Sequence, residues 1–236
     1  MGKTYFGLGR KEADIYSNRS VSNKITQDEI TSHWEMRALR KGIQSILSAR
    51  FSEKSNQKIS RKEKEKIFAF LNPYIKPTFE VLEIGTGIGR MTKELSARVK
   101  SVVTTDISAR MIRRAKINLK NVRNVKFRLG RILDLKLKPR SFDLVFETRV
   151  LIHILDFKEF QRTINLMKKL SDRIFISEHM YNTKPDLGNK KVSIFSIVRK
   201  RSDYINAFKP FRLVKAKKVN LNDPYTFMFF EKSKKD

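Results

Sequence analysis

Short apolar runs and longer amphipathic segments alternate along most of this chain. Apolar runs of strand length occupy residues 79–84, 102–106, 142–147 and 173–178, and residues 125–129 alternate between apolar and basic side chains, as an edge strand does. Apolar side chains recur at helical spacing in the segments between them, most clearly after Gly89, from Ser108 to near Asn121, and from Asp156 to Leu170. Regular alternation of strands and helices predicts a mostly parallel, doubly wound sheet with right-handed crossovers.

The C-terminal part departs from this alternation. A short helix is expected at 203–208, followed by two strands at 211–220 and 225–231. Only Asn222, Asp223 and Pro224 form the turn between them, and strands joined by so short a turn are antiparallel. We therefore expect the sheet to finish in an antiparallel hairpin.

Two capping boxes precede the sheet. Residues 26–29 begin a pattern of apolar positions that predicts a helix from Thr26 to about Arg50, with the only tryptophan, Trp34, on its apolar face. Residues 60–63 predict a second helix that ends before Pro73. Residues 1–25 lack a period, and a polar segment at 52–57 separates the two helices. We expect 1–59 to be an N-terminal helical extension, with a possible role as a lid, and 60–236 to be the α/β domain.

Composition removes several classes of chemistry. The chain has no cysteine, which excludes disulfides, thiolate zinc sites and a cysteine nucleophile. The start has no long apolar region, and no later segment reaches membrane-spanning length, so we expect a cytoplasmic protein with no membrane association. Lysine and arginine number 52 against 24 acidic residues, and residues 98–140 alone hold 14 basic and 2 acidic side chains. This field favours polyanions such as RNA, although a compositional bias without a nucleic-acid role explains the charge nearly as well.

The candidate chemistry lies between the first two strands. Gly85, Gly87 and Gly89 form a glycine-rich turn after the first strand, and Asp106 ends the second. Such a turn fits many nucleotide-type cofactors. Glu83 narrows the choice, because a carboxylate beside the turn repels a pyrophosphate and attracts a ligand that carries a sulfonium and an ammonium. We therefore expect S-adenosylmethionine as the cofactor.

With these motifs, the chain from about residue 60 to 236 resembles the class I S-adenosylmethionine-dependent methyltransferases, which have a Rossmann-like fold. The resemblance implies a seven-stranded sheet of order 3-2-1-4-5-7-6. It also implies a set of cofactor-binding residues: Glu83, Gly85, Thr86, Gly87, Gly89, Asp106, Ile107, Met111, Arg131, Ile132 and Glu147. The chain departs from the family after the third strand, where members commonly show Gly-Asp-Ala and this sequence has Gly130, Arg131 and Ile132.

The segment after the fourth strand bears on the methyl acceptor. Residues 142–154 resemble members that modify small molecules, and the loop at 147–150 lacks the Asn-Pro-Pro pattern of base-amine methyltransferases. Arg149 and Ile152 stand where a metal-dependent relative has acids, so no metal is expected. A hydroxyl acceptor needs a base, and the candidates for catalysis are His153, His179 and Tyr181.

Three functions remain open at this point. The first is methyl transfer to a hydroxyl or amine of a small-molecule or glycan-like acceptor. The second is methylation of RNA through the basic surface, and the third is a non-catalytic factor that binds RNA or protein on this fold. The sequence leaves the oligomeric state undetermined.

Overall fold

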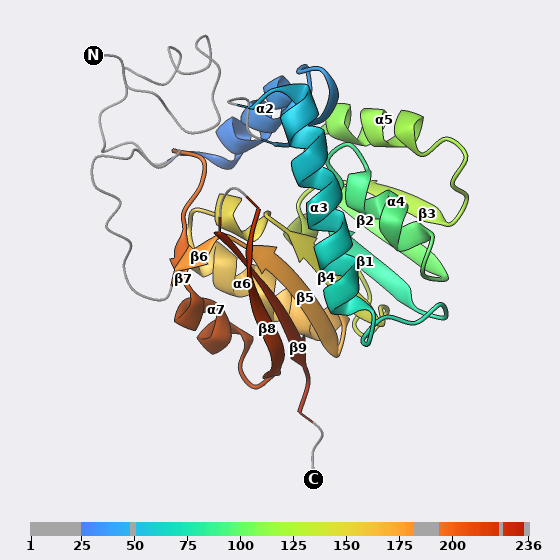
Figure 1. Ribbon diagram of the computed structural model, residues 1–236. Helices are drawn as coiled ribbons and strands as arrows, with labels where there is room; N and C mark the ends of the chain where they lie inside the picture. Colours follow the sequence, from blue (N-terminus) through green and yellow to red (C-terminus); the bar gives the residue numbers. More distant parts are fainter. Residues whose placement is uncertain (1–24, 48–50, 182–193, 222–223, 234–236) are drawn as a thin grey trace.

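A computed structural model describes residues 25–47, 51–181, 194–221 and 224–233. Its centre is a seven-stranded sheet of order β3-β2-β1-β4-β5-β9-β8 (Figure 1). In that order the strands span Val125–Leu129, Ser101–Asp106, Glu80–Ile84, Leu144–Thr148, Arg173–Glu178, Pro224–Glu231 and Arg212–Asn220. The first five are parallel, and β9 and β8 run antiparallel. The predicted fold class, strand order and C-terminal hairpin are confirmed.

Helices cover both faces of the sheet. The helices of the described residues are α2 (Gln27–Arg37), α3 (Glu53–Leu71), α4 (Arg90–Ser96), α5 (Ala109–Asn118), α6 (Phe157–Leu170) and α7 (Arg201–Phe208). Short 3-10 turns occur at η1 (Gly42–Ser45), η2 (Ile132–Asp134) and η3 (Leu151–His153). A second, unpredicted sheet pairs β6 (Met180–Tyr181) in parallel with β7 (Arg199–Lys200).

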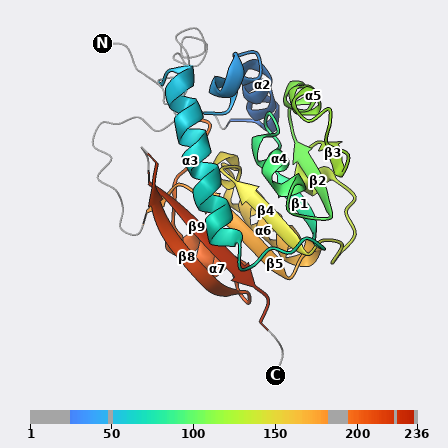
Figure 2. The ribbon, with the colours of Figure 1, turned by 45° about the vertical axis from the view of Figure 1, so that its right-hand side comes forward.

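The core consists of two apolar layers, one on each side of the sheet. Figures 1 and 2 show α3 lying along one face, where it and α4 pack on side chains such as Val81, Phe146 and Phe227. The neighbouring strand positions point the other way, and Val145 and Ile174 pack there against α6 and α7. This alternation follows the two-residue period of the strands, so both layers are readable in the sequence.

Side-chain caps fix two of the predicted helices. The Ser108 hydroxyl accepts a hydrogen bond from Met111 N at 3.1 Å and starts α5. The Asp156 carboxylate accepts one from Glu159 N at 2.7 Å and starts α6. Such bonds satisfy backbone donors that have no partner inside the helix. At the sheet edge, Lys126 and Arg128 of β3 are exposed, as expected of an edge strand.

The prediction for the start of the second helix was wrong. Ser52 caps α3 by accepting a hydrogen bond from Ser55 N at 3.2 Å, so the predicted polar linker at 52–57 is helical. Ser60 and Glu63, which matched a capping box, lie inside the helix and are buried. Glu63 is held there by ion pairs rather than by a cap. The expected boundary at 59/60 therefore falls within a continuous helix.

The prediction for the first helix was too long. Thr26 and Glu29 form the expected capping box, but α2 ends at Arg37. The Arg37 guanidinium then donates hydrogen bonds to the carbonyl oxygens of Gln44, Ser45 and Leu47, which folds the chain back in a tight turn. Residues 1–24 and 48–50, which include parts of the predicted extension, lie outside the described residues, as do 182–193. Among the helices described, none is long and apolar enough to cross a membrane.

Candidate cofactor and acceptor site

A cavity of about 730 Å³ opens at the carboxyl ends of the parallel strands. Ligands bind at this edge in open α/β sheets, because the turns that leave the strands form a crevice there. Helix α2 closes the cavity from the opposite side. Most predicted site residues line it: Glu83, Gly85, Thr86, Gly87, Asp106, Ile107, Met111, Arg131, Ile132, His153, His179 and Tyr181.

Two predicted cofactor residues do not line the cavity. Gly89 begins α4 in a left-handed conformation, and a Cβ there would lie 2.9 Å from Leu119, so its role is close helix packing. Glu147 is fully buried and turns beneath the loop that follows β4. In place of Glu147, the next residues Thr148 and Arg149 reach the cavity.

The glycine turn and Asp106 form one unit. Gly87 N donates a hydrogen bond to Asp106 Oδ2 at 2.8 Å, and Ser108 N donates to Oδ1 at 2.9 Å. Gly85 has a φ of +88°, and a Cβ at this position would lie 2.3 Å from Val150. Only glycine avoids this clash with Val150 and adopts that backbone without strain. Burial raises the pKa of Asp106 to about 6, so it is ionised at neutral pH.

Glu83 points beneath the glycine turn rather than freely into the cavity. Its Oε2 accepts hydrogen bonds from the Thr92 and Thr104 hydroxyls at 2.5 and 2.7 Å. Burial raises the pKa of Glu83 to about 7, and the two hydroxyl bonds oppose that shift. A cationic ligand in the cavity would favour the ionised form of this carboxyl.

Arg131, where the family resemblance is weakest, has its own carboxylate partners. Its guanidinium makes two hydrogen bonds to Asp134, at 2.7 and 2.8 Å, and lies 3.4 Å from Glu159. Glu159 also accepts a hydrogen bond from Gln27 of α2 at 2.5 Å. Arg131 therefore links the turn after β3 to α6, and through Glu159 to the helix that covers the cavity.

Two buried carboxyls hold the loop that follows β4. Glu147 accepts hydrogen bonds from the backbone of Val150 and Leu151, and Glu178 accepts one from Ile152 N at 3.1 Å. Burial raises the pKa of Glu147 to about 7, and burial together with the Glu147 charge raises the pKa of Glu178 well above its usual value. The pair therefore retains at least one proton at neutral pH.

Arg199 of β7 holds the carbonyl side of the same loop. Its guanidinium donates hydrogen bonds to the carbonyl oxygens of Leu151, at 2.9 Å, and Ile154. Side chains from β4, β5 and β7 thus satisfy both the donors and the acceptors of a short irregular segment. The loop that carries Arg149 and His153 is consequently fixed in position.

His153 has a defined tautomer. Its Nδ1 lies 2.6 Å from the carbonyl oxygen of Phe195, which can only accept, so Nδ1 carries the hydrogen and Nε2 has a free lone pair. The ring packs edge-on against Trp34 of α2, with centroids 4.9 Å apart. Burial lowers the pKa of His153 to about 4, so the imidazole is neutral at physiological pH.

The other two catalytic candidates lie further along the same wall. The His179 ring packs against Tyr225 of β9, with centroids 4.0 Å apart. Tyr181 is half-buried in β6 and lines the cavity. The structure thus brings His153, from the loop after β4, to the same cavity as His179 and Tyr181, which both follow β5.

Several lining residues were not predicted. From α2 come His33, Trp34 and Arg37, and from the strand ends come Arg149 and Tyr225. His33 is stacked on Phe195 with ring centroids 4.2 Å apart, and burial lowers the pKa of His33 to about 3. The sequence signal that could have placed His33 in the cavity is its position beside the apolar residues of the helix. Tyr225 had no local signal, because it reaches the site through pairing of β9 with β5.

The described residues contain no group of three or more histidine or acidic side chains arranged to hold a metal ion.

Comparison with known proteins agrees with this geometry. Residues 81–171, from the first strand to the end of α6, match a model described as a methyltransferase domain. The same stretch holds the glycine turn, Asp106 and the loop after β4. Residues 81–171 of this chain are thus similar to the methyltransferase domain family. This match and the fold support the family predicted from the sequence.

The curated relatives of this methyltransferase domain are longer proteins. Phosphoethanolamine N-methyltransferase 1 of Arabidopsis thaliana is 28% identical over 137 residues, which cover 56% of this chain and 27% of that protein. The enzyme of the same name from Triticum aestivum is 27% identical over 177 residues, which cover 72% of this chain and 34% of the relative. The chain thus spans about a third or less of the length of these relatives.

Solved structures share the fold at low identity. A Haemonchus contortus phosphoethanolamine N-methyltransferase 1, in complex with phosphoethanolamine and S-adenosylhomocysteine, has a TM-score of 0.70 and 17% identity, covering 90% of this chain and 51% of that one. The N-methyltransferase NodS of Bradyrhizobium japonicum, with S-adenosylhomocysteine, has a TM-score of 0.68 and 16% identity, covering 87% and 99%. At such identities the likeness establishes the methyltransferase fold.

Proposed function

We propose that this protein transfers a methyl group from S-adenosylmethionine to a nitrogen or oxygen of a small-molecule acceptor. The observation that carries the proposal is the shared cavity of the Gly85–Gly87 turn, Asp106 and His153. The relatives and neighbours, among them enzymes named for phosphoethanolamine and solved with S-adenosylhomocysteine, support this chemistry.

The chain's own residues fit the cofactor. Gly85 and Gly87 line the cavity without a side chain, so a ligand can approach their backbone. Gly87 N and Ser108 N donate to different Asp106 oxygens, and a carboxylate has about four lone-pair sites, which leaves acceptor capacity for the ribose hydroxyls. Ile107 and Met111 flank the same region with apolar surface. Arg131 and Ile132 lie after β3, where the adenine is expected. The bound cofactor supplies an electrophilic methyl group on a sulfonium.

His153 is the base that this arrangement favours. The Phe195 carbonyl holds Nδ1–H, so Nε2 accepts a proton from an acceptor hydroxyl or ammonium. His179 and Tyr181, on the same wall, are the further candidates. The remainder of catalysis is alignment of the acceptor with the methyl group, to which α2 contributes by closing the cavity.

Cofactor binding tests the proposal first. Titration with S-adenosylhomocysteine, followed by calorimetry, should give saturable binding in the micromolar range, whereas a non-catalytic factor with an unused pocket should give none. Labelled S-adenosylmethionine incubated with fractionated small molecules, phosphoethanolamine included, should then yield a methylated product.

The basic surface keeps RNA as a second candidate acceptor. Lys120, Arg123, Lys126 and Arg128 are exposed along the edge formed by β3 and the turn before it. Because each neutralised phosphate releases counterions, RNA binding here should weaken steeply between low and physiological salt. Label recovered in an RNase-sensitive fraction would favour RNA over the small-molecule acceptor.

A further inference from the structure

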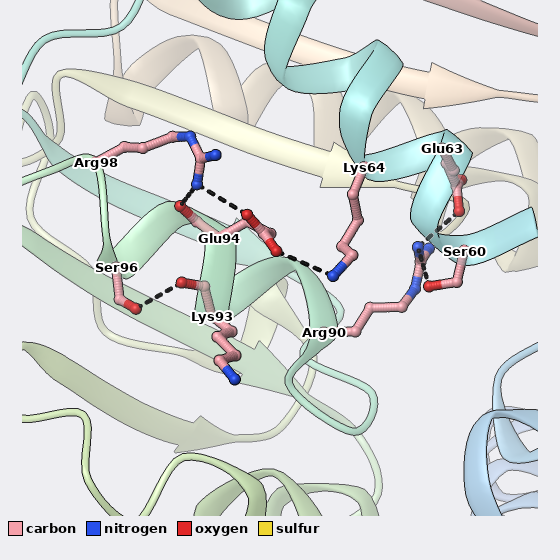
Figure 3. A network of polar contacts seen from close by, with 8 residues as sticks. All are labelled: Ser60, Glu63, Lys64, Arg90, Lys93, Glu94, Ser96 and Arg98. Carbon is pink, nitrogen blue, oxygen red and sulfur yellow. Dashed lines mark hydrogen bonds and ion pairs between the residues drawn. The ribbon is translucent and has the colours of Figure 1, made fainter. Parts of the chain in front are cut away.

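Two arginines at the cavity share a single buried carboxylate. Glu63 Oε2 of α3 lies 2.7 Å from Arg90 Nη1 and 3.3 Å from Arg149 Nη2. The Arg90 and Ser60 contacts appear in Figure 3. Glu63 is 1% exposed, whereas the Arg90 and Arg149 side chains are 10% and 15% exposed. Two guanidiniums against one carboxylate leave an excess positive charge in this cluster.

The excess charge faces the cavity. Arg90 and Arg149 line the cavity, and Glu63 lies behind them. Burial opposes ionisation of Glu63, but the Arg149 and Arg90 charges outweigh it and lower its pKa, so the carboxylate is fully committed to the two arginines. Glu178 and Glu147 also act on Arg149, but burial raises the pKa of both carboxyls, so they offset only part of its charge.

Arg149 belongs to a polar wall assembled from three strand ends. Its guanidinium lies 5.7 Å from the centre of the Tyr225 ring, against which the His179 ring also packs at 4.0 Å. Arg149 has a φ of +60°, a left-handed conformation that costs a residue with a side chain about 1–2 kcal/mol. Its backbone N–H donates to the carbonyl oxygen of Ser177 at 3.0 Å, which holds the residue in that conformation.

The other cavity arginines differ from Arg149. Arg131 is paired with Asp134 and Glu159. Arg37 directs its donors to the carbonyl oxygens that shape the turn after α2. Arg149 follows β4, and β1 separates β4 from β2, whose end carries Asp106 of the predicted ribose site.

We propose that Arg149, with Tyr225 and His179 beside it, binds an anionic group of the methyl acceptor, a carboxylate or a phosphate. A guanidinium presents paired donors that match either anion. The anion would balance the charge that Glu63 leaves uncompensated, and it would hold the acceptor on the β4–β5–β9 side of the cavity. This inference rests on the proposed methyltransferase function and specifies its acceptor.

Arg149→Met tests the inference with little risk to the fold. The substitution leaves Glu63 paired with Arg90, so no buried charge is left without a partner. Lys64→Met is the matched control: Lys64 follows Glu63 on α3 and pairs with Glu94 at 2.9 Å (Figure 3). The fluorescence of Trp34, the only tryptophan, reports events in the cavity that it lines.

The probes are S-adenosylhomocysteine, then inorganic phosphate or acetate added to the loaded protein at constant ionic strength. We expect saturable phosphate or acetate binding that Arg149→Met weakens at least tenfold and Lys64→Met leaves unchanged. The probe that binds more tightly identifies the kind of anion. S-adenosylhomocysteine affinity should differ less than threefold among the three proteins.

Three results would overturn the inference. The first is that neither anion binds the loaded wild-type protein. The second is that Arg149→Met binds the anion as tightly as the wild type does. The third is that Arg149→Met loses S-adenosylhomocysteine affinity, which would assign the arginine to the cofactor carboxylate. Failure of the wild-type protein to bind S-adenosylhomocysteine at all would instead refute the proposed function.

Discussion

Replacement of Glu147 by glutamine should make the protein less sensitive to alkaline pH. In the folded protein burial raises the Glu147 pKa from 4.5 to about 7, so the native state holds a proton that the unfolded chain has released. The stability from this proton is complete below pH 4.5 and is lost as pH rises through 7. For this group alone, the loss between pH 5 and 8 is about 2–3 kcal/mol of unfolding free energy.

Glutamine keeps an oxygen for the Val150 and Leu151 amides and adds a permanent donor toward Glu178. The variant therefore imitates the protonated carboxyl at every pH. Urea unfolding at pH 5 and pH 8 should show the wild type losing about 2–3 kcal/mol more than Glu147→Gln over this interval. Groups remote from this site are common to both proteins and cancel in the comparison, whereas Glu178 is coupled to Glu147, so the difference reports the pair.

Glu231→Gln provides the control, because it removes a half-buried carboxylate that pairs with Arg173. It should follow the wild-type pH dependence. The reasoning fails if Glu147→Gln and wild type lose the same free energy between the two pH values, because Glu147 would then be ionised throughout.

Three further predictions concern the cavity. Asp106→Asn should weaken S-adenosylhomocysteine binding at least tenfold in calorimetry, since an amide nitrogen would face backbone donors. The control is Asp143→Asn, which loses a similar backbone contact at the opposite end of the sheet and should leave this binding unchanged. Gly85→Ala should abolish cofactor binding, because its Cβ would meet Val150 at 2.3 Å; normal affinity would refute the placement of the site. His153→Asn should lower kcat about 10²- to 10⁴-fold for a hydroxyl acceptor. The acid limb of wild-type kcat should fall near pH 4, since burial lowers the His153 pKa to that value, and a limb near 6.5 would argue against this base.

The sheet was predictable because its signals are local. Strands β1 to β5 are apolar runs with turns at both ends, and Arg173–Glu178 was predicted with its observed bounds. The hairpin followed from a turn too short for any other connection. Asp106 and the glycines were recognisable because they stand where one strand ends and a helix begins.

The polar interior was harder to predict because its partners are distant in sequence. Glu63 resembled a capping residue, yet its function in the fold depends on Arg149, 86 positions later. Tyr225 reaches the site only because Glu178 of β5 pairs with Thr226 of β9. Sequence periodicity identifies the face of a strand or helix on which a residue lies, but not the charged side chain that it contacts there. The acceptor half of the cavity was accordingly the least predictable part.

The attachment of α2 has a consequence for turnover. Arg114 of α5 donates hydrogen bonds to the carbonyl oxygens of Ala38, Arg40 and Gly42, and so holds the segment after α2 on the domain. The same segment places Ile46 against the glycine turn, while Trp34 packs on His153. A single displacement of α2 and the segment after it would open both ends of the cavity together. Cofactor exchange and acceptor exchange would then share a single opening step, and its rate would set an upper limit on the catalytic cycle.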